Sequence, residues 1–134
     1  MPEPQHAGRN KAVSAEKQAQ ASAELSQLVE TVLDDMKASD VVSIDVRHLT
    51  SITDFMFVAS GRSDRHVRAI AEAIVERCTQ AGHRPLGVEG LEGGEWVLID
   101  LADVIVHVMV PATRGFYEIE KLWDISRPVG SSDA

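Results

Sequence analysis

Acidic side chains gather around one tryptophan between residues 89 and 110, and this grouping is the chain's clearest candidate for chemistry. No Lys or Arg occurs between Pro85 and Thr113. Unpaired acids beside Trp96 suit a surface that meets a basic, partly apolar partner. A solvated acidic loop beside a tryptophan that completes the core is an equally weighted alternative. The acids of the stretch are Glu89, Glu92, Glu95, Asp100 and Asp103.

Asp100 and Asp103 also carry the one enzymatic interpretation that the sequence allows. Nucleotidyltransferases place two carboxylates close together on one strand, where they hold a divalent metal against a triphosphate. A Gly-Ser turn at residues 60–63, between a strand and a helix, fits the same arrangement. However, the two acids flank a break between apolar runs and need not point together, and no third acid is clearly placed. A metal-dependent nucleotidyltransferase-like enzyme is therefore the weaker alternative.

The turn at residues 60–63 has a simpler interpretation. Ser63 is a good helix N-cap, because its hydroxyl can accept a hydrogen bond from an orphan backbone N–H. A Gly-Ser turn at a helix N-terminus could also cradle a phosphate, with the nearby arginines adding charge. The motif is too short to be a fingerprint, so capping alone is favoured.

Metal binding and thiol chemistry find little support in the sequence. The histidines are scattered without a pair at ligand spacing, and the chain has one cysteine. His107 lies on an apolar strand face, which is typical of a hydrogen-bonded core histidine. Cys78 falls on the apolar face of a helix and is expected to be buried and inert. We therefore expect no cofactor, no metal and no catalytic residue.

Composition bounds the class of protein. With 134 residues, the chain is long enough for one domain with a modest core. A net charge of −8 disfavours binding to bare nucleic acid, because phosphate contacts need clustered Lys and Arg. The single cysteine fits a reducing compartment. The longest apolar run, residues 104–112, is far below the ~20 residues of a membrane helix. Glu3 and the absence of a hydrophobic leader argue against secretion, so we expect a cytoplasmic protein.

Hydrophobic periodicity predicts an α/β domain with a mixed, roughly five-stranded sheet and flanking helices. A domain at residues 23–125 is expected between a flexible N-terminal extension, 1–22, and a flexible tail, 126–134. Gly82 is the expected stop of the second helix. Strands are predicted near 41–46, 55–60, 84–88, 96–101 and 104–110, and helices near 23–37, 63–81 and 114–123 with Thr113 as the last helix's cap.

The two apolar runs at 96–101 and 104–110 are typical of an antiparallel strand pair. Both faces of 104–110 are mostly apolar, which predicts a central strand covered on both sides. In the first run, alternation separates an apolar face from a mixed one that could meet solvent or a partner. The apolar face holds Val97, Ile99 and Leu101, and the mixed face holds Trp96, Leu98 and Asp100.

Taken together, several stretches resemble the ribosomal silencing factor family, also called the Iojap family. The resemblance covers residues 24–124, and Ala102 departs from the glycine that many members carry. The matching stretches are IDV at 44–46, SITDF at 51–55, ASGRS at 59–63, RHV at 65–67, GVEG at 87–90, WVLIDLADVIVHV at 96–108 and RGFYEIEKLW at 114–123.

The resemblance implies a non-catalytic factor with a nucleotidyltransferase-like fold. Members bind the large ribosomal subunit at ribosomal protein L-fourteen and hinder joining of the small subunit, which represses translation. The resemblance also implies a homodimer off the ribosome. The charge and the apolar run lengths predict no membrane and no sequence-specific nucleic acid among the partners. It implies a partner-binding surface of Trp96, Leu98, Asp100 and Asp103 with the rim Glu89, Glu92 and Glu95, and more distantly Arg114, Tyr117 and Lys121.

Overall fold

The fold was analysed in a computed structural model, which describes residues 3–117 and, within them, side chains from residue 16 to residue 115. The predicted mixed five-stranded sheet with flanking helices is confirmed. The elements are α1 (Glu3–Asp35), β1 (Ser39–Asp45), β2 (Phe55–Ser60), α2 (Asp64–Gln80), β3 (Gly87–Glu89), β4 (Trp96–Asp100), β5 (Val104–Met109) and α3 (Pro111–Tyr117).

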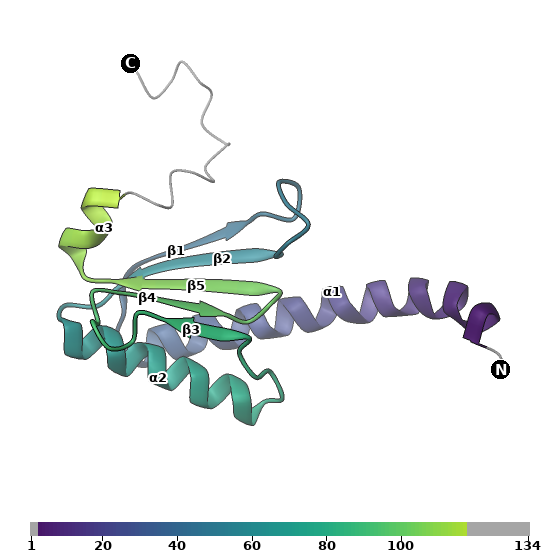
Figure 1. Cartoon of the computed structure of the whole chain (residues 1–134), viewed down its shortest axis with the longest axis horizontal. Coiled ribbons are helices and arrows are strands. Elements are labelled where there is room, and N and C mark those ends of the chain that lie inside the picture. The colour runs from purple at the N-terminus through teal and green to yellow at the C-terminus, as the bar shows by residue number, and fades with distance from the viewer. Residues whose placement is uncertain (1–2, 118–134) are drawn as a thin grey trace, which may run out of the picture.

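The strand order is β1-β2-β5-β4-β3, so β5 is the central strand, as predicted (Figure 1). β1 and β2 form an antiparallel hairpin, and β4 and β5 form another. β2 and β5 are parallel neighbours, which requires a long crossover connection, and this connection contains α2. A nucleotidyltransferase-like fold is compatible with this sheet.

This topology gives the sheet two distinct ends. Asp45, Phe55, Asp100 and Val104 lie at one end, which we call the hairpin end because the β1–β2 and β4–β5 connections meet there. Trp96 and Met109 pair at the opposite end, which we call the tryptophan end.

The main core lies between one face of the sheet and the two long helices, which cover it together (Figure 1). The apolar periodicity that predicted both helices is confirmed, because its residues are buried in the core or partly buried against it. β4 contributes Val97 and Ile99 to this core, again as predicted. The helix residues of the core are Leu25, Val29, Val32 and Leu33 from α1, and Val67, Ile70, Ala71, Ile74 and Cys78 from α2.

The opposite face of the sheet carries a smaller apolar cluster. Val46, Met56, Val58 and Met109 are buried there, and Trp96 packs against them. Both long helices lie on the other side of the sheet (Figure 1). The mixed side of β4, with Trp96, Leu98 and Asp100, therefore lies on the face of the sheet that the two long helices leave uncovered.

The turn into α2 favours the capping interpretation over a phosphate cradle. The Ser63 hydroxyl accepts a hydrogen bond from the His66 N–H at 3.1 Å, as an N-cap does. The Arg62 N–H donates to His66 Nδ1 at 3.0 Å, and the Gly61 N–H donates to the Met109 carbonyl at 2.9 Å. A Cβ on Gly61 would lie 2.8 Å from a methyl of Val67, so close packing explains this glycine. These backbone donors already have partners within the chain.

Two helix boundaries differ from the prediction. α1 begins at Glu3 rather than near residue 23, since Ala-, Gln- and Lys-rich sequence favours helix without an apolar stripe. Its N-terminal half runs past the sheet (Figure 1). The expected flexibility of residues 1–22 stays a prediction. α3 begins at Pro111, where proline suits the first helical turn, so the proposed Thr113 cap was wrong. Residues 118–123 lie outside the described part.

Smaller differences affect two strands. β1 starts at Ser39 and contains a bulge between Ser39 and Val42, and β3 is limited to three residues. α2 ends at Gln80 ahead of Gly82, whose φ of 94° is the expected left-handed stop. No helix in the described part of the chain is long and apolar enough to cross a membrane.

Candidate partner-binding surface

Trp96 is the first residue of β4, and a hydrogen bond from a buried histidine of β5 fixes its orientation. The β4–β5 register pairs Leu98 with His107, which makes Trp96 a diagonal neighbour of that histidine. The Trp96 Nε1–H donates to His107 Nδ1 at 3.0 Å, and the two ring centroids are 5.9 Å apart. Trp96 is half-buried, whereas His107 is 6% exposed. The indole is therefore held at the sheet surface in one orientation.

Burial determines the state of His107. Desolvation lowers the pKa of His107 to about 4, so the ring is neutral at neutral pH. Because Nδ1 accepts the hydrogen bond from Trp96, the proton of the neutral ring lies on Nε2. The predicted hydrogen-bonded core histidine is confirmed, and its partner is the tryptophan of the candidate surface.

A shallow hollow lies beside Trp96. It has a volume of about 190 Å³ and is lined by Glu89, Gly90, Trp96, Leu98 and His107. Glu89 enters it from β3, where it pairs with Leu98. Sites for drug-sized molecules span roughly 300–1,000 Å³, so this hollow suits a single side chain of a protein partner better than a cofactor.

Gly90 allows the loop between β3 and β4 to close over the start of β4. Its φ is 85°, in the left-handed region that glycine adopts freely. A Cβ built on Gly90 would lie 2.1 Å from the Trp96 carbonyl oxygen, which no side chain permits. This glycine therefore sets the position of Trp96 relative to the acidic loop.

The acidic rim lies only at the tryptophan end. Glu89, Glu92 and Glu95 are exposed, and their carboxylates make no hydrogen bond or salt bridge within residues 16–115. Asp100 is the last residue of β4, so it lies roughly 13 Å from Trp96 along the strand, at ~3.3 Å per residue. Asp103 follows in the turn, where its carbonyl accepts from the Asp54 and Phe55 N–H groups.

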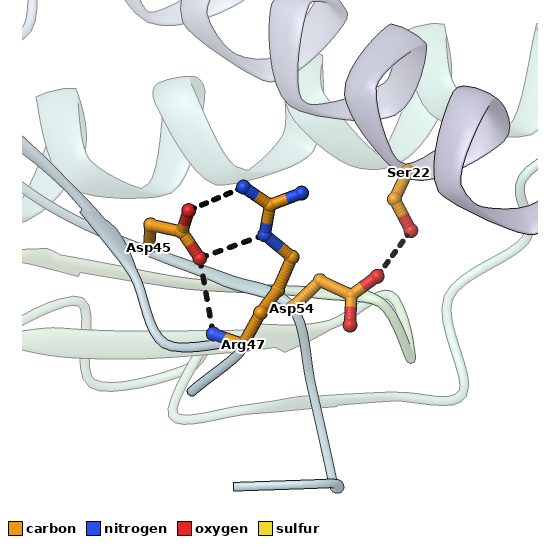
Figure 2. Close-up of polar contacts among 4 residues, drawn as sticks. All are labelled: Ser22, Asp45, Arg47 and Asp54. Carbon is orange, nitrogen blue, oxygen red and sulfur yellow. Dashed lines mark hydrogen bonds and ion pairs between the residues drawn. The ribbon is translucent and has the colours of Figure 1, made fainter. Parts of the chain in front are cut away.

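The hairpin-end acids stabilise turns and helix docking. Asp100 Oδ1 accepts from the Ala102 N–H at 2.9 Å, and Ala102 has a φ of 73°. Figure 2 shows the Ser22 hydroxyl of α1 donating to Asp54 at 2.7 Å, beside the Asp45–Arg47 pair. Hydrogen bonds from Arg47 lower the pKa of Asp45 to about 2.

Asp100 thus uses one carboxylate oxygen to hold its own turn, and Asp103 contributes its backbone carbonyl to the neighbouring loop. Within the described residues, no group of three or more His, Cys, Asp or Glu side chains could hold a metal ion. Cys78 is fully buried, as predicted, and desolvation raises the pKa of its thiol to about 11.

The predicted site residues thus divide into groups. Trp96, Leu98 and Glu89 come together, and Glu92 and Glu95 extend the rim along the same loop. Asp100 shares the face of Trp96 but lies at the hairpin end, with Asp103 beyond it. Arg114 is buried and donates to the Asp40 carbonyl and the Ser60 hydroxyl, whereas Lys121 and the side chain of Tyr117 lie outside the described part.

Sequence analysis missed two residues of the site, His107 as the partner of Trp96 and Gly90 as the close-packed turn. A signal for the first was available. In an antiparallel pair the residue numbers of partners have a constant sum, so the length of the turn after β4 decides that Met109 pairs with Trp96 and that His107 lies diagonally across from it. The role of Gly90 could not be predicted from the sequence, because it depends on how closely the loop approaches the strand in three dimensions.

Fold and site together define a small α/β protein with a partly exposed tryptophan and an acidic rim on one face of its sheet. Residues 18–134 match the family described as "Ribosomal silencing factor during starvation", and the chain belongs to this family. It is 45% identical over 105 residues to a ribosomal silencing factor of Chromobacterium violaceum, an alignment that covers 78% of this chain and 86% of that protein.

Two further comparisons extend this result. The mouse protein named "Mitochondrial assembly of ribosomal large subunit protein 1" is 32% identical over 91 residues, which cover 66% of this chain and 40% of that one. A crystal structure of a C. violaceum protein superimposes with a TM-score of 0.75 at 44% identity, covering 81% of this chain and 93% of that one. The resemblance seen in the sequence is thereby confirmed.

Proposed function

We propose that this protein binds the large ribosomal subunit through the Trp96 surface and thereby blocks joining of the small subunit. The Trp96 surface comprises Trp96 and Leu98 with the rim Glu89, Glu92 and Glu95. Ribosomal protein L-fourteen is the contact that the family resemblance implies. The protein acts in the cytoplasm as a repressor of translation.

The orientation of Trp96 is the observation that carries this proposal. A half-exposed indole, held by His107 beside a side-chain-sized hollow, has the features of an interface anchor. The unpaired glutamates around it favour a basic partner and faster encounter. The printed name of the mouse relative, which refers to the ribosomal large subunit, supports the choice of subunit.

Blocking by this route is steric and requires no catalysis. A protein that occupies the intersubunit face of the large subunit excludes the small subunit for as long as it stays bound. The dissociation rate therefore sets the duration of silencing, and anchor residues act mainly on that rate. The proposal accordingly assigns no catalytic residue, metal or cofactor.

Co-sedimentation with purified large subunits tests the proposal, together with an assay of subunit joining. We expect Trp96→Ala to weaken binding roughly thirty-fold, since truncating an interface anchor costs about 2 kcal/mol. Ile52→Ala is the matched control, because Ile52 is an 80% exposed apolar side chain in the β1–β2 connection. Equal binding by folded Trp96→Ala and wild type would show that the surface is wrong. A wild type that neither binds nor blocks would refute the function.

The family resemblance also supports a homodimer off the ribosome. Ile44 and Trp96, which are partly buried on the face of the sheet opposite the two long helices, supply apolar surface for self-association. Light scattering across a concentration series should give twice the monomer mass in the absence of ribosomes. A monomer mass at the highest concentration would contradict this part of the proposal.

A further inference from the structure

A second hollow lies on the other side of the sheet from Trp96, between α2 and β3. It has a volume of about 200 Å³ and is lined by Glu72, Val75, Glu76, Val88 and Leu91. Val88 pairs with the buried Ile99, so it points toward the helices, whereas its neighbour Glu89 points to the Trp96 side. The hollow is therefore separate from the Trp96 surface, although the same edge strand borders both.

The walls of this hollow are apolar and its rim is acidic. Val75, Val88 and Leu91 are partly buried and pack against the main core. Glu72 and Glu76 are exposed one turn apart on α2, and neither makes a salt bridge or hydrogen bond within residues 16–115. This pairing of an apolar floor with unpaired carboxylates suits an apolar side chain flanked by cations.

The cations nearest in α2 do not neutralise this rim. Arg77 forms a salt bridge with Asp35 of α1. Arg68 reaches toward the β3–β4 loop, where its guanidinium donates to the Glu92 carbonyl at 3.4 Å. Both guanidinium groups thus have partners other than Glu72 and Glu76.

β3 adds a backbone feature to the hollow. It forms one edge of the sheet, and an edge strand presents a row of backbone groups to any chain that lies alongside. Leu86, immediately before β3, is 74% exposed and shares the α2 side with Val88 by alternation. An extended segment that pairs with β3 would therefore find apolar contacts on its α2-facing side.

We propose that the groove between α2 and β3 is a second docking site, which takes an extended basic segment of a partner protein. The segment adds a strand to β3, places an apolar side chain against Val75, Val88 and Leu91, and sets Lys or Arg side chains against Glu72 and Glu76. The groove's volume suits one aliphatic side chain. A second copy of this chain is a poor occupant, because its own β3 edge would bring the same acids into opposition.

Short peptides provide the probe. Full-length protein labelled with nitrogen-15 is titrated with a capped peptide of alternating Lys and Val, about eight residues long to exceed a typical strand. We expect amide shifts at Val75, Val88 and Leu91. A peptide with Ser in place of Val should bind at least ten-fold more weakly, and one with Glu in place of Lys should not bind. Shifts centred on Trp96 and Leu98 would overturn the proposal.

Charge reversal separates the groove from general attraction to an acidic protein. The double variant Glu72→Lys with Glu76→Lys should lose at least ten-fold in peptide affinity. The control Glu24→Lys with Glu30→Lys makes the same change of net charge on exposed positions of α1 and should bind within two-fold of wild type. Equal losses in both variants would refute the site. Glu76→Gln is a milder change that should lose two- to five-fold in peptide affinity. It replaces the double variant in this test if the double variant unfolds.

Two further measurements exclude other occupants. Trp96→Ala should keep wild-type peptide affinity, which makes this result independent of ribosome binding. Concentration-dependent broadening at Val75 and Val88 without peptide would show a second copy in the groove and would overturn the proposal.

Discussion

Both ends of the sheet carry carboxylates, but among the described side chains those that are hydrogen-bonded or ion-paired within the chain, Asp45, Asp54 and Asp100, lie at the hairpin end. At the hairpin end the pairs are Asp45 with Arg47, Asp54 with Ser22, and Asp100 with the Ala102 N–H. At the tryptophan end no residue within 16–115 hydrogen-bonds or ion-pairs with the carboxylates of Glu89, Glu92 and Glu95. Charges with internal partners stabilise the fold, whereas charges without them are available to another molecule.

One polar contact of the tryptophan end, between Trp96 and His107, orients a side chain at the surface instead. There the hydrogen bond joins two rings, Trp96 and His107, and places one of them at the surface. Changes at the hairpin end should therefore alter stability with little effect on binding. Changes at the tryptophan end should alter both, or binding alone.

Gly90→Ala should produce the largest effect at the tryptophan end. The new Cβ would meet the Trp96 carbonyl at 2.1 Å and would hold alanine at a φ of 85°. We expect a loss of about 3 kcal/mol in the free energy of unfolding, combining backbone strain with displacement of the loop. Urea denaturation measures this loss, and co-sedimentation should show weaker binding to large subunits.

Gly93→Ala is the matched control in the same loop. A Cβ there would have no neighbour closer than 4.0 Å, so both stability and binding should stay near wild type. If Gly90→Ala behaves like Gly93→Ala, the close approach of the loop to Trp96 does not position the anchor.

As pH falls, the stability contributed by His107 at the tryptophan end should be lost at a higher pH than the stability contributed by Asp45 at the hairpin end. Burial lowers the pKa of His107 from 6.5 to about 4, so between these values the unfolded chain binds a proton that the folded chain does not. The stability contributed by the neutral ring is complete above pH 6.5 and declines as pH falls toward 4, by roughly 3 kcal/mol. Asp45 acts later, because its contribution is present above pH 3.8 and is lost as pH falls through about 2.

Denaturation curves from pH 7 to pH 4.5 test this order. His107→Gln removes the titrating ring, so the variant should lose less stability than wild type over that range. The difference in slope isolates His107 from the carboxylates that titrate in both proteins. Parallel curves would mean that His107 titrates near its ordinary value and that its burial does not hold the ring neutral.

Much of this contrast was predictable from the sequence, because alternation and helical periodicity are local signals. The two faces of β4, the central position of β5 and the capped α2 helix all followed from them. The acidic character of the loop beside Trp96 was equally visible.

Other features depended on distances that no local pattern contains. The sequence places Asp103 seven residues from Trp96, yet only the strand geometry shows that Trp96 begins β4 at one end of the sheet and Asp103 lies in the turn at the other end. Register decides that His107 faces the indole, and register is a property of two strands together. α1 starts well before the predicted residue 23 because helix propensity extends the helix beyond the residues that pack.

Ser22→Ala should destabilise the hairpin end without affecting the partner surface. Ser22 is 1% exposed, and its hydroxyl donates a hydrogen bond that joins α1 to Asp54, whose own N–H donates to the Asp103 carbonyl. We expect a loss of about 1.5 kcal/mol, the lower range for a hydrogen bond to a charged group. Ser26→Ala, one turn further along α1, is the control. If Ser22→Ala also weakens binding to the large subunit, the two ends of the sheet are coupled, and the proposed separation of stability from binding is wrong.

Ala102→Gly should give the smallest change, and in the opposite direction. Ala102 adopts a φ of 73° in the β4–β5 turn, where an L-residue with a Cβ is strained and glycine is not. Asp100 already holds the turn through the Ala102 N–H, so the backbone need not move when the methyl group is removed. Relief of strain should exceed the added flexibility of the unfolded chain, and we expect a gain of about 0.5–1 kcal/mol in urea denaturation. Ala73→Gly, inside α2, should instead lose a similar amount. Binding to the large subunit should stay unchanged in Ala102→Gly, because this turn lies at the end of the sheet away from Trp96. A loss of stability would show that the turn requires the alanine methyl group, and a change in binding would extend the partner surface to the hairpin end.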